Sequence, residues 1–170
     1  IGGVKVSQNE NWETAFCAAY NACYKQLYFM SLGLLHNEQD AEDLVQETLL
    51  KAYKGYVNLK EKAFFKTWII KIWLNQSRRF YSKHRRDYPA KPYSETDGYR
   101  EYNAQWDEKL TLLSHLNRLS DSHRQMIVLR YFSQLTVPEM ARILRLPQGT
   151  VKSRLSRALH NLKILYEEES

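Results

Sequence analysis

The chain has 170 residues, of which 44% are hydrophobic, so it can bury one or two modest cores. Its formal net charge of +6 favours an acidic partner such as nucleic acid. No apolar run approaches the roughly 18 residues of a membrane span, and no signal-peptide pattern opens the chain, so we expect no membrane insertion.

The first predicted element is a helix over residues 11–35. Its apolar side chains recur at steps of three, four and seven, namely Trp12, Phe16, Tyr20, Cys23, Leu27, Met30 and Leu34. Cys17 and Cys23 are six residues apart in this helix, about 9 Å along its axis, which is too far for an unstrained disulfide. We therefore expect both cysteines to be small buried hydrophobes in a reducing compartment.

Two more helices are predicted in the N-terminal half. Asn37 is a candidate cap for a helix that runs to about Tyr53, with Gly55 as its C-terminal stop. A third, strongly basic helix is predicted over residues 62–86. Residues 87–107 contain prolines, a glycine and no helical apolar stripe, and we interpret them as a flexible linker.

The C-terminal part predicts helices over residues 108–116, 121–132, 136–144 and 147–166. Thr136 and Glu139 have the spacing of a capping box at the start of the third of these. A short helix, a tight turn and a second helix with a polar face form a helix-turn-helix. The predicted fold class is therefore all-α, with two small helical domains (1–86 and 108–170) joined by the linker 87–107.

The last helix has two distinct faces. Val151, Leu155, Ala158, Leu159, Leu162 and Tyr166 fall on one side at about 100° per residue. The opposite side carries Thr150, Ser153, Arg154, Arg157 and Asn161. Arginine can bond guanine bidentately, and Ser or Thr can bond bases or phosphates, whereas Lys152 lies on a flank suited to a phosphate. These residues predict a helix that binds duplex DNA.

The stretch "LSDSHRQMIVLRYFSQLTVPEMARILRLPQGTVKSRLSRAL" resembles region 4 of bacterial RNA polymerase sigma factors of the extracytoplasmic-function (ECF) group. That resemblance implies binding to a −35 promoter element through Thr150, Lys152, Ser153, Arg154 and Arg157. Arg145 stands where the family usually has glycine at the turn, so it has to adopt a left-handed conformation or accept a different turn. A response-regulator output domain has a similar helix-turn-helix, so the N-terminal half must decide between the two.

The stretch "DAEDLVQETLLKAY", residues 40–53, has an acidic outer side formed by Glu42, Asp43, Gln46 and Glu47. On physical grounds this is either a solubilising surface at the helix start or a docking surface for a basic partner. The stretch is similar to sigma region 2.2. The resemblance implies that these four residues bind core RNA polymerase at the clamp helices of its largest subunit.

The stretch "FFKTWIIKIWLNQSRRFYSKHRR", residues 64–86, interleaves basic and aromatic side chains, as a surface for single-stranded DNA requires. In the sigma family the matching region melts the promoter and captures a flipped base of the −10 element. The resemblance implies that role for Lys66, Lys71, Asn75, Arg78, Arg79, Lys83, Arg85 and Arg86. Arg79 and Trp73 depart from the acidic or amide residue and the small residue common at those two positions.

The whole sequence is thus identified as an ECF-type sigma factor, a non-enzymatic cytoplasmic subunit that initiates transcription without a cofactor or metal. The resemblance implies three partners: core polymerase, promoter DNA in duplex and melted form, and an anti-sigma factor. The five histidines are scattered, and we expect them at the surface or as caps. Two alternatives remain at this point, a stand-alone helix-turn-helix transcriptional regulator and a helical interaction protein that binds no DNA.

Overall fold

The computed structural model describes residues 9–84 and 112–168, with side chains for 12–82 and 112–168. Within these ranges every regular element is helical, as the sequence predicts. The N-terminal unit consists of α1 (Asn9–Leu35), α2 (Glu38–Tyr56), the 3₁₀ turn η1 (Lys62–Phe64) and α3 (Phe65–His84). The C-terminal unit begins with a helical stretch at 112–116. It continues through α5 (Asp121–Ile127), the π-helical turn η2 (Val128–Phe132), α6 (Val137–Leu144) and α7 (Gln148–Glu168).

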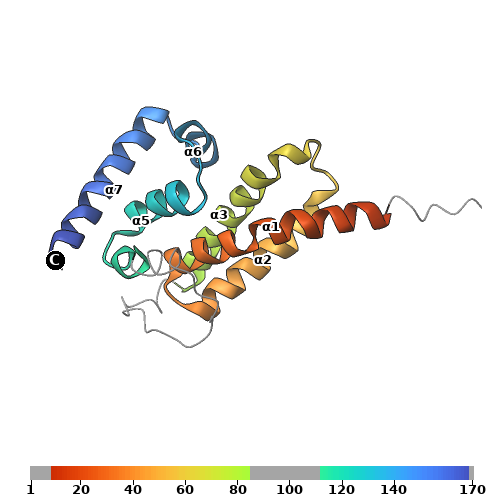
Figure 1. The fold of residues 1–170 in the computed structure, drawn as a ribbon, viewed down its shortest axis with the longest axis horizontal. Helices are drawn as coiled ribbons and strands as arrows, with labels where there is room; N and C mark the ends of the chain where they lie inside the picture. Colours follow the sequence, from red (N-terminus) through yellow and green to blue (C-terminus); the bar gives the residue numbers. More distant parts are fainter. Residues whose placement is uncertain (1–8, 85–111, 169–170) are drawn as a thin grey trace, which may run out of the picture.

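In the N-terminal unit, α2 packs along α1 and α3 packs against both (Figure 1). The core between them contains long apolar side chains, among them Leu27, Leu44, Ile69 and Trp73, none more than 1% exposed. The indole Nε1 of Trp73 donates a hydrogen bond to Ser31 Oγ at 2.9 Å, so the buried ring has its one polar group satisfied. This bond connects α3 to the C-terminal part of α1.

The N-terminal unit confirms the predicted cap and corrects the predicted stop. Asn37 accepts a 2.9 Å hydrogen bond from the backbone nitrogen of Asp40 at the start of α2. Gly55 does not end that helix, which continues to Tyr56. A Cβ at Gly55 would lie 3.0 Å from Trp68 Cζ2, so this glycine lets α2 approach α3 closely. The third predicted helix begins with the turn η1, and its last two residues, Arg85 and Arg86, lie outside the described residues.

Two expectations about single side chains were wrong. Cys17 is exposed, whereas Cys23 is buried and its pKa is raised to about 11 by burial; neither forms a disulfide. His115 is buried and its ring stacks on Tyr166 at 3.9 Å, so it is neither a surface residue nor a cap.

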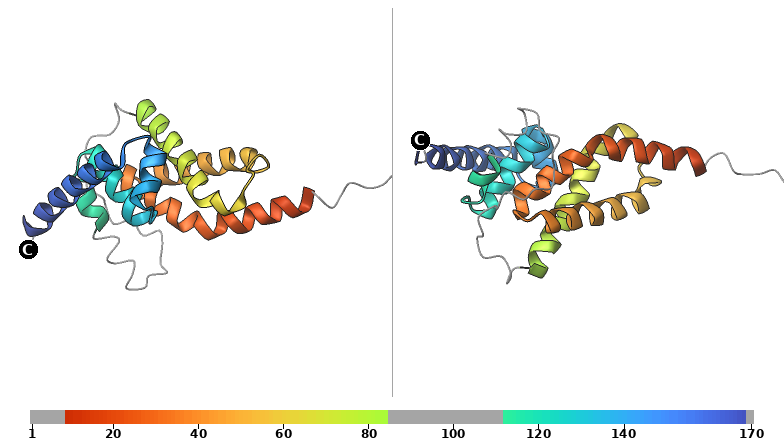
Figure 2. Two further views of the ribbon diagram at one scale, coloured as in Figure 1. Left: turned by 90° about the horizontal axis from the view of Figure 1, so that it is seen from above. Right: turned by 60° about the horizontal axis from the view of Figure 1, so that its bottom comes forward.

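The two units pack against each other (Figure 2). The second half of α1 contacts α5 and η2, while α3 contacts α6. The predicted linker, residues 87–107, lies outside the described residues, as do residues 108–111 of the predicted helix before α5. In the described part of the chain no helix is both long and apolar enough to cross a membrane.

Candidate nucleic-acid interface

The helix-turn-helix is formed by α6, a short turn and α7. Thr136 caps α6, and Glu139 completes the capping box by accepting the Thr136 backbone N–H at 2.7 Å. Hydrogen bonds from the hydroxyl and backbone of Thr136 hold the pKa of Glu139 below its usual range. Arg145 follows α6 with φ 56° and ψ 46°, which is the left-handed conformation. The turn therefore keeps the geometry that a glycine would give, with an exposed arginine in its place.

Helix α7 presents the predicted polar side to solvent. Lys152, Ser153, Arg154 and Arg157 are exposed and Thr150 is half-buried, while Val151, Ala158 and Leu162 hold the helix to its unit. Ser153 Oγ donates to the Thr150 carbonyl at 3.0 Å, so its hydroxyl already has a partner within the helix. The two arginines are three residues apart and can therefore point toward one surface.

Two residues of α7 do not follow the predicted division. Leu159 was expected in the core but is 36% exposed. Asn161 was expected on the exposed face, but its amide lies 3.0 Å from His123 Nδ1 and the side chain is only half-exposed. The packed side of α7 is thus narrower than its pattern of leucines indicates, because α5 and α6 cover only part of it.

The acidic face, defined here as Glu42, Asp43, Gln46 and Glu47, lies on the exposed side of α2. All four side chains are exposed, while Ala41, Leu44 and Val45 between them are buried. The structure thus brings the four predicted polymerase contacts together on two successive turns of one helix.

The basic face, defined here as Lys66, Lys71, Asn75, Arg78 and Arg79, lies on α3. All five side chains are exposed. Lys71, Asn75 and Arg78 are spaced four and three residues apart, which places them in one row along the helix. The other three predicted −10 residues have no described side chains: Lys83 lies in the last turn of α3, and Arg85 and Arg86 lie beyond it.

Arg79 also lines a groove that sequence reasoning missed. The groove runs between α2 and α3, has a volume of about 380 Å³, and is lined by Glu47, Leu50, Lys51, Lys54, Gln76, Arg79 and Phe80. Arg79 and Glu47 belong to the basic and acidic faces, so the two faces adjoin at this groove. Leu50, which is 59% exposed, is an apolar side chain in the lining of this groove. Leu50 is an apolar residue among polar residues on the outer side of α2, and this break in the sequence pattern could have indicated the groove.

No group of three or more His, Cys, Asp or Glu side chains with metal-binding geometry occurs among the residues that the structure describes. The arrangement consists of charged and polar side chains on rigid helices, and such surfaces bind macromolecules. The class of protein is therefore a helical DNA-binding protein that also has an exposed acidic face on α2.

Comparisons with known proteins narrow this class. Residues 19–87 match the family model Sigma-70 region 2, and residues 115–163 match Sigma-70, region 4. The chain is 28% identical to the ECF RNA polymerase sigma factor SigW of Bacillus subtilis over 165 residues, 89% of this chain and 88% of SigW. It is 26% identical to SigM of the same organism over 153 residues, 86% of this chain and 92% of SigM.

Solved structures agree in fold. The sigma factor RpoE of Bartonella quintana, in complex with the anti-sigma factor NepR, superposes with a TM-score of 0.67 at 26% identity, covering 93% of this chain and 98% of RpoE. CnrH, in complex with the cytosolic domain of CnrY, superposes with a TM-score of 0.64 at 26% identity. This match covers 96% of this chain and 93% of CnrH. The chain belongs to the sigma-70 family of RNA polymerase sigma factors, in its ECF group. It binds RNA polymerase and directs transcription initiation at promoters.

Proposed function

We propose a division of this activity between the two units and assign side chains to each part. Residues 1–86 act as region 2, which binds core polymerase and melts the −10 element, and residues 108–170 act as region 4, which binds the −35 element. Residues 87–107 connect them. The observation that carries this assignment is the placement of opposite charges on separate, fully exposed helix faces, acidic on α2 and basic on α3 and α7.

The acidic face docks on core polymerase. Its carboxylates are exposed and adjacent, so they can orient a basic surface such as the clamp helices of the largest polymerase subunit. The four residues assigned to this contact are Glu42, Asp43, Gln46 and Glu47. Leu50 lies one turn further along α2 and adds an apolar contact beside them.

Reversing two charges of the acidic face, Asp43→Arg with Glu47→Lys, is expected to weaken core-polymerase binding about tenfold or more, since repulsion replaces steering and pairing. The fold should survive because both side chains are exposed. Titration of labelled protein with core polymerase measures the effect. The matched control is Glu61→Lys, also an exposed charge reversal in this unit but away from α2. Equal affinity of the double reversal and the parental chain would refute the docking assignment.

The basic face binds the −10 element. Lys66, Lys71, Arg78 and Arg79 supply charge for phosphates, and Asn75 supplies a donor and an acceptor for a base edge. Lys83, Arg85 and Arg86 continue the same run of basic residues in the sequence. Half-buried Trp68, in the first turn of α3, and exposed Phe64, at the end of η1, supply rings near an unstacked base.

Lys71→Ala with Arg78→Ala is expected to reduce the salt dependence of open-complex formation. Each lost phosphate contact should flatten the log–log slope by about 0.7 to 0.9. The measurement is the equilibrium constant for strand opening across a salt series, and Lys25→Ala, an exposed lysine on α1, is the control. A double variant that keeps the parental slope would remove these two residues from the DNA contact.

The −35 element is bound by α7. Arg154 and Arg157 read base edges, Thr150 and Ser153 contact bases or phosphates, and Lys152 contacts a phosphate. The exposed Arg145 lies in the turn just before α7 and adds a positive charge to this DNA contact.

This chain performs no catalysis itself: the polymerase core supplies the chemistry, and the protein acts beside it in the cytoplasm. An anti-sigma factor is a further partner, supported by the structural neighbours bound to proteins of that kind. A stand-alone transcriptional regulator would bind duplex DNA without polymerase and would not need the acidic face. Strand opening of a promoter fragment by the chain with core polymerase, and none without it, tests the proposed function against that alternative.

A further inference from the structure

The loop between α2 and α3 (Figure 1) is held to the end of α2 by one lysine. Lys62, the first residue of η1, donates from Nζ to the backbone carbonyl of Tyr56 at 2.7 Å, and the same Nζ lies 3.8 Å from the centre of the Tyr56 ring. Tyr56 is the last residue of α2, where carbonyls lack a following turn and carry the negative end of the helix dipole. The ammonium group thus meets a carbonyl and an aromatic face, both of which attract a cation.

The anchor for this lysine is rigid. Tyr56 is 3% exposed, and its ring packs edge-on against Phe16 of α1 and Phe65 of α3, with ring centres 5.1 Å and 5.7 Å apart. Contacts from three helices therefore fix the ring and the carbonyl of Tyr56. An ammonium group bound there is fixed with them, and so is the start of η1.

The other hydrogen bonds of the loop are local. The backbone N–H groups of Asn58, Leu59 and Phe64 each donate to the carbonyl three residues earlier, at 3.0 to 3.1 Å. Bonds of this kind shape single turns and do not join the two ends of a loop. Among the residues that the structure describes, the bond from Lys62 is the only hydrogen bond between η1 and α2. This side chain is therefore the polar contact that closes the loop over residues 57–61.

The closed loop presents an aromatic side chain beside the basic face. Phe64 is 57% exposed, although Phe65 next to it is buried. Leu59 and Phe64 line one groove with Trp68 and Lys71 of α3, and α6 forms the other wall of that groove. An exposed ring next to cations suits stacking with an unpaired base. The position of the Phe64 ring follows from the path of the loop that carries it.

Lys62 differs from the lysines assigned to phosphates. Lys66 and Lys71 are exposed, and neither donates a hydrogen bond to another residue that the structure describes. Their ammonium groups are available to an external anion. The ammonium group of Lys62 is already bound to Tyr56, so its charge acts inside the protein.

We propose that Lys62 is a positioning residue for the −10 contact, which fixes the loop so that Phe64 is in place for an unstacked base and does not touch the DNA itself. The effect on DNA rests on the proposed function, whereas the tether of the loop to α2 does not. A ring that is fixed before binding loses little entropy when the base arrives, so the tether favours capture of the base.

Lys62→Met tests the tether, because methionine keeps most of the side-chain length and removes the ammonium group. Lys62→Arg is the conservative variant, since a guanidinium group also donates to carbonyls and stacks on aromatic rings. Lys60→Met, at an exposed lysine of the same loop, is the matched control for the loss of one charge. Amide hydrogen exchange of the free full chain, followed by NMR, measures opening of the loop at Asn58, Leu59 and Phe64.

We expect exchange at these three amides to become about fivefold faster or more in Lys62→Met, and to stay within about twofold of the parental rate in Lys62→Arg and Lys60→Met. Parental exchange rates in Lys62→Met would overturn the tether, whatever the chain does with DNA.

The positioning role is tested by binding of a single-stranded −10 oligonucleotide to the chain with core polymerase. Each base is removed in turn to leave an abasic site, and the largest loss of affinity measures capture of a base. We expect this loss to shrink about fivefold in Lys62→Met and to return in Lys62→Arg, because stacking needs a fixed ring. The salt dependence should stay parental in both variants.

Two results would overturn the positioning role and leave the proposed function intact. One is an unchanged abasic loss in Lys62→Met despite faster exchange. The other is a log–log salt slope flattened by about 0.7 in Lys62→Met, which would show a direct phosphate contact. A parental chain without any abasic loss would refute the proposed −10 contact and the positioning role with it, while the exchange rates still decide the tether.

Discussion

Alanine at Arg154 or Arg157 is expected to cost about 1–3 kcal/mol of binding to the −35 duplex and to relax the preference at one base pair. Both guanidinium groups are exposed on the outer side of α7, beyond the buried Val151 and Ala158. The measurement is a binding scan in which each base pair of the element is substituted in turn. A uniform loss of affinity with no change in preference would mean that these arginines position the helix and do not read the sequence.

Two control variants separate reading from other effects. Lys152→Ala should weaken binding about equally on all sequences, because a lysine on the flank meets phosphate. Leu162→Ala should cost about 2–5 kcal/mol of stability through a cavity, with the base preference unchanged. Leu162 is the suitable core control, since it is 8% exposed whereas Leu159 is 36% exposed.

Trp73→Ala is expected to destabilise the N-terminal unit by about 3–5 kcal/mol. The indole is fully buried between α3 and α1, and its removal leaves a large cavity. It also leaves the hydroxyl of Ser31 without its donor, although that hydroxyl still donates to the Leu27 carbonyl at 2.8 Å. Urea unfolding followed by circular dichroism measures the loss.

The comparison for this prediction is Trp73→Phe, which keeps most of the ring volume and deletes the N–H. It should cost distinctly less than alanine, because the cavity is smaller. If the two variants are equally destabilised, the hydrogen bond to Ser31 and not the packing of the ring accounts for the stability.

Most of the fold could be predicted from the sequence because each helix carries its own local signals. The apolar spacing of α1, the Asn37 cap of α2 and the Thr136–Glu139 capping box depend on residues within a turn of each other, and the structure has all three. The exposed faces could be predicted in the same way, since the spacing of apolar and polar residues identifies the outer side of a helix.

Glycines were less predictable, since their role depends on distant neighbours. Gly55 lies near a helix end, where a glycine usually stops the helix. A side chain is excluded there instead by Trp68, thirteen residues away on another helix. Gly33 lies in the last turn of α1, and the three atoms nearest to a Cβ added there belong to the other unit. No local pattern distinguishes a glycine that ends a helix from one that admits another helix.

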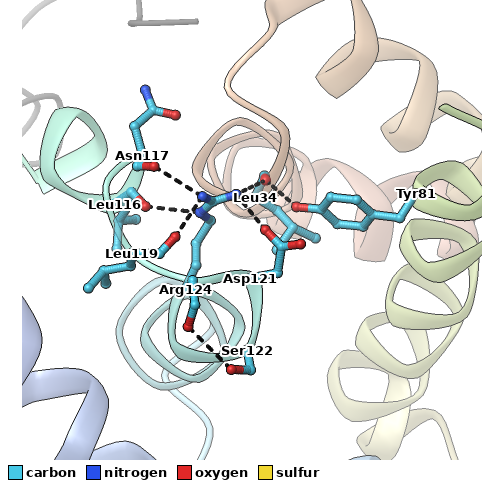
Figure 3. A network of polar contacts seen from close by, with 9 residues as sticks. Leu34, Tyr81, Leu116, Asn117, Leu119, Asp121, Ser122 and Arg124 are labelled. Atoms are coloured by element: carbon cyan, nitrogen blue, oxygen red, sulfur yellow. Dashed lines mark hydrogen bonds and ion pairs between the residues drawn. The ribbon is translucent and has the colours of Figure 1, made fainter. Parts of the chain in front are cut away.

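The extent of burial was also beyond local reasoning. Leu159 and Cys17 were both expected to be buried, yet both are exposed. Conversely, Arg124 reads as a surface residue, and only the convergence of carbonyls from two units makes its burial possible (Figure 3).

In the described part of the chain, three helices are followed by a residue with a left-handed backbone and a bulky side chain: His36, Gln134 and Arg145, with φ of 55° to 56°. Each such residue costs roughly 1–2 kcal/mol relative to a relaxed backbone, a cost that glycine would largely avoid. Glycine at these positions would therefore raise the free energy of unfolding. These are the positions where engineering for heat resistance would begin. Burial and the neighbouring Arg124 of the C-terminal unit lower the pKa of His36 to about 3, so His36 lies close to the contact between the two units. Gln134 is exposed and could be replaced by glycine with less disturbance, whereas the charge of the exposed Arg145 is assigned to the −35 contact.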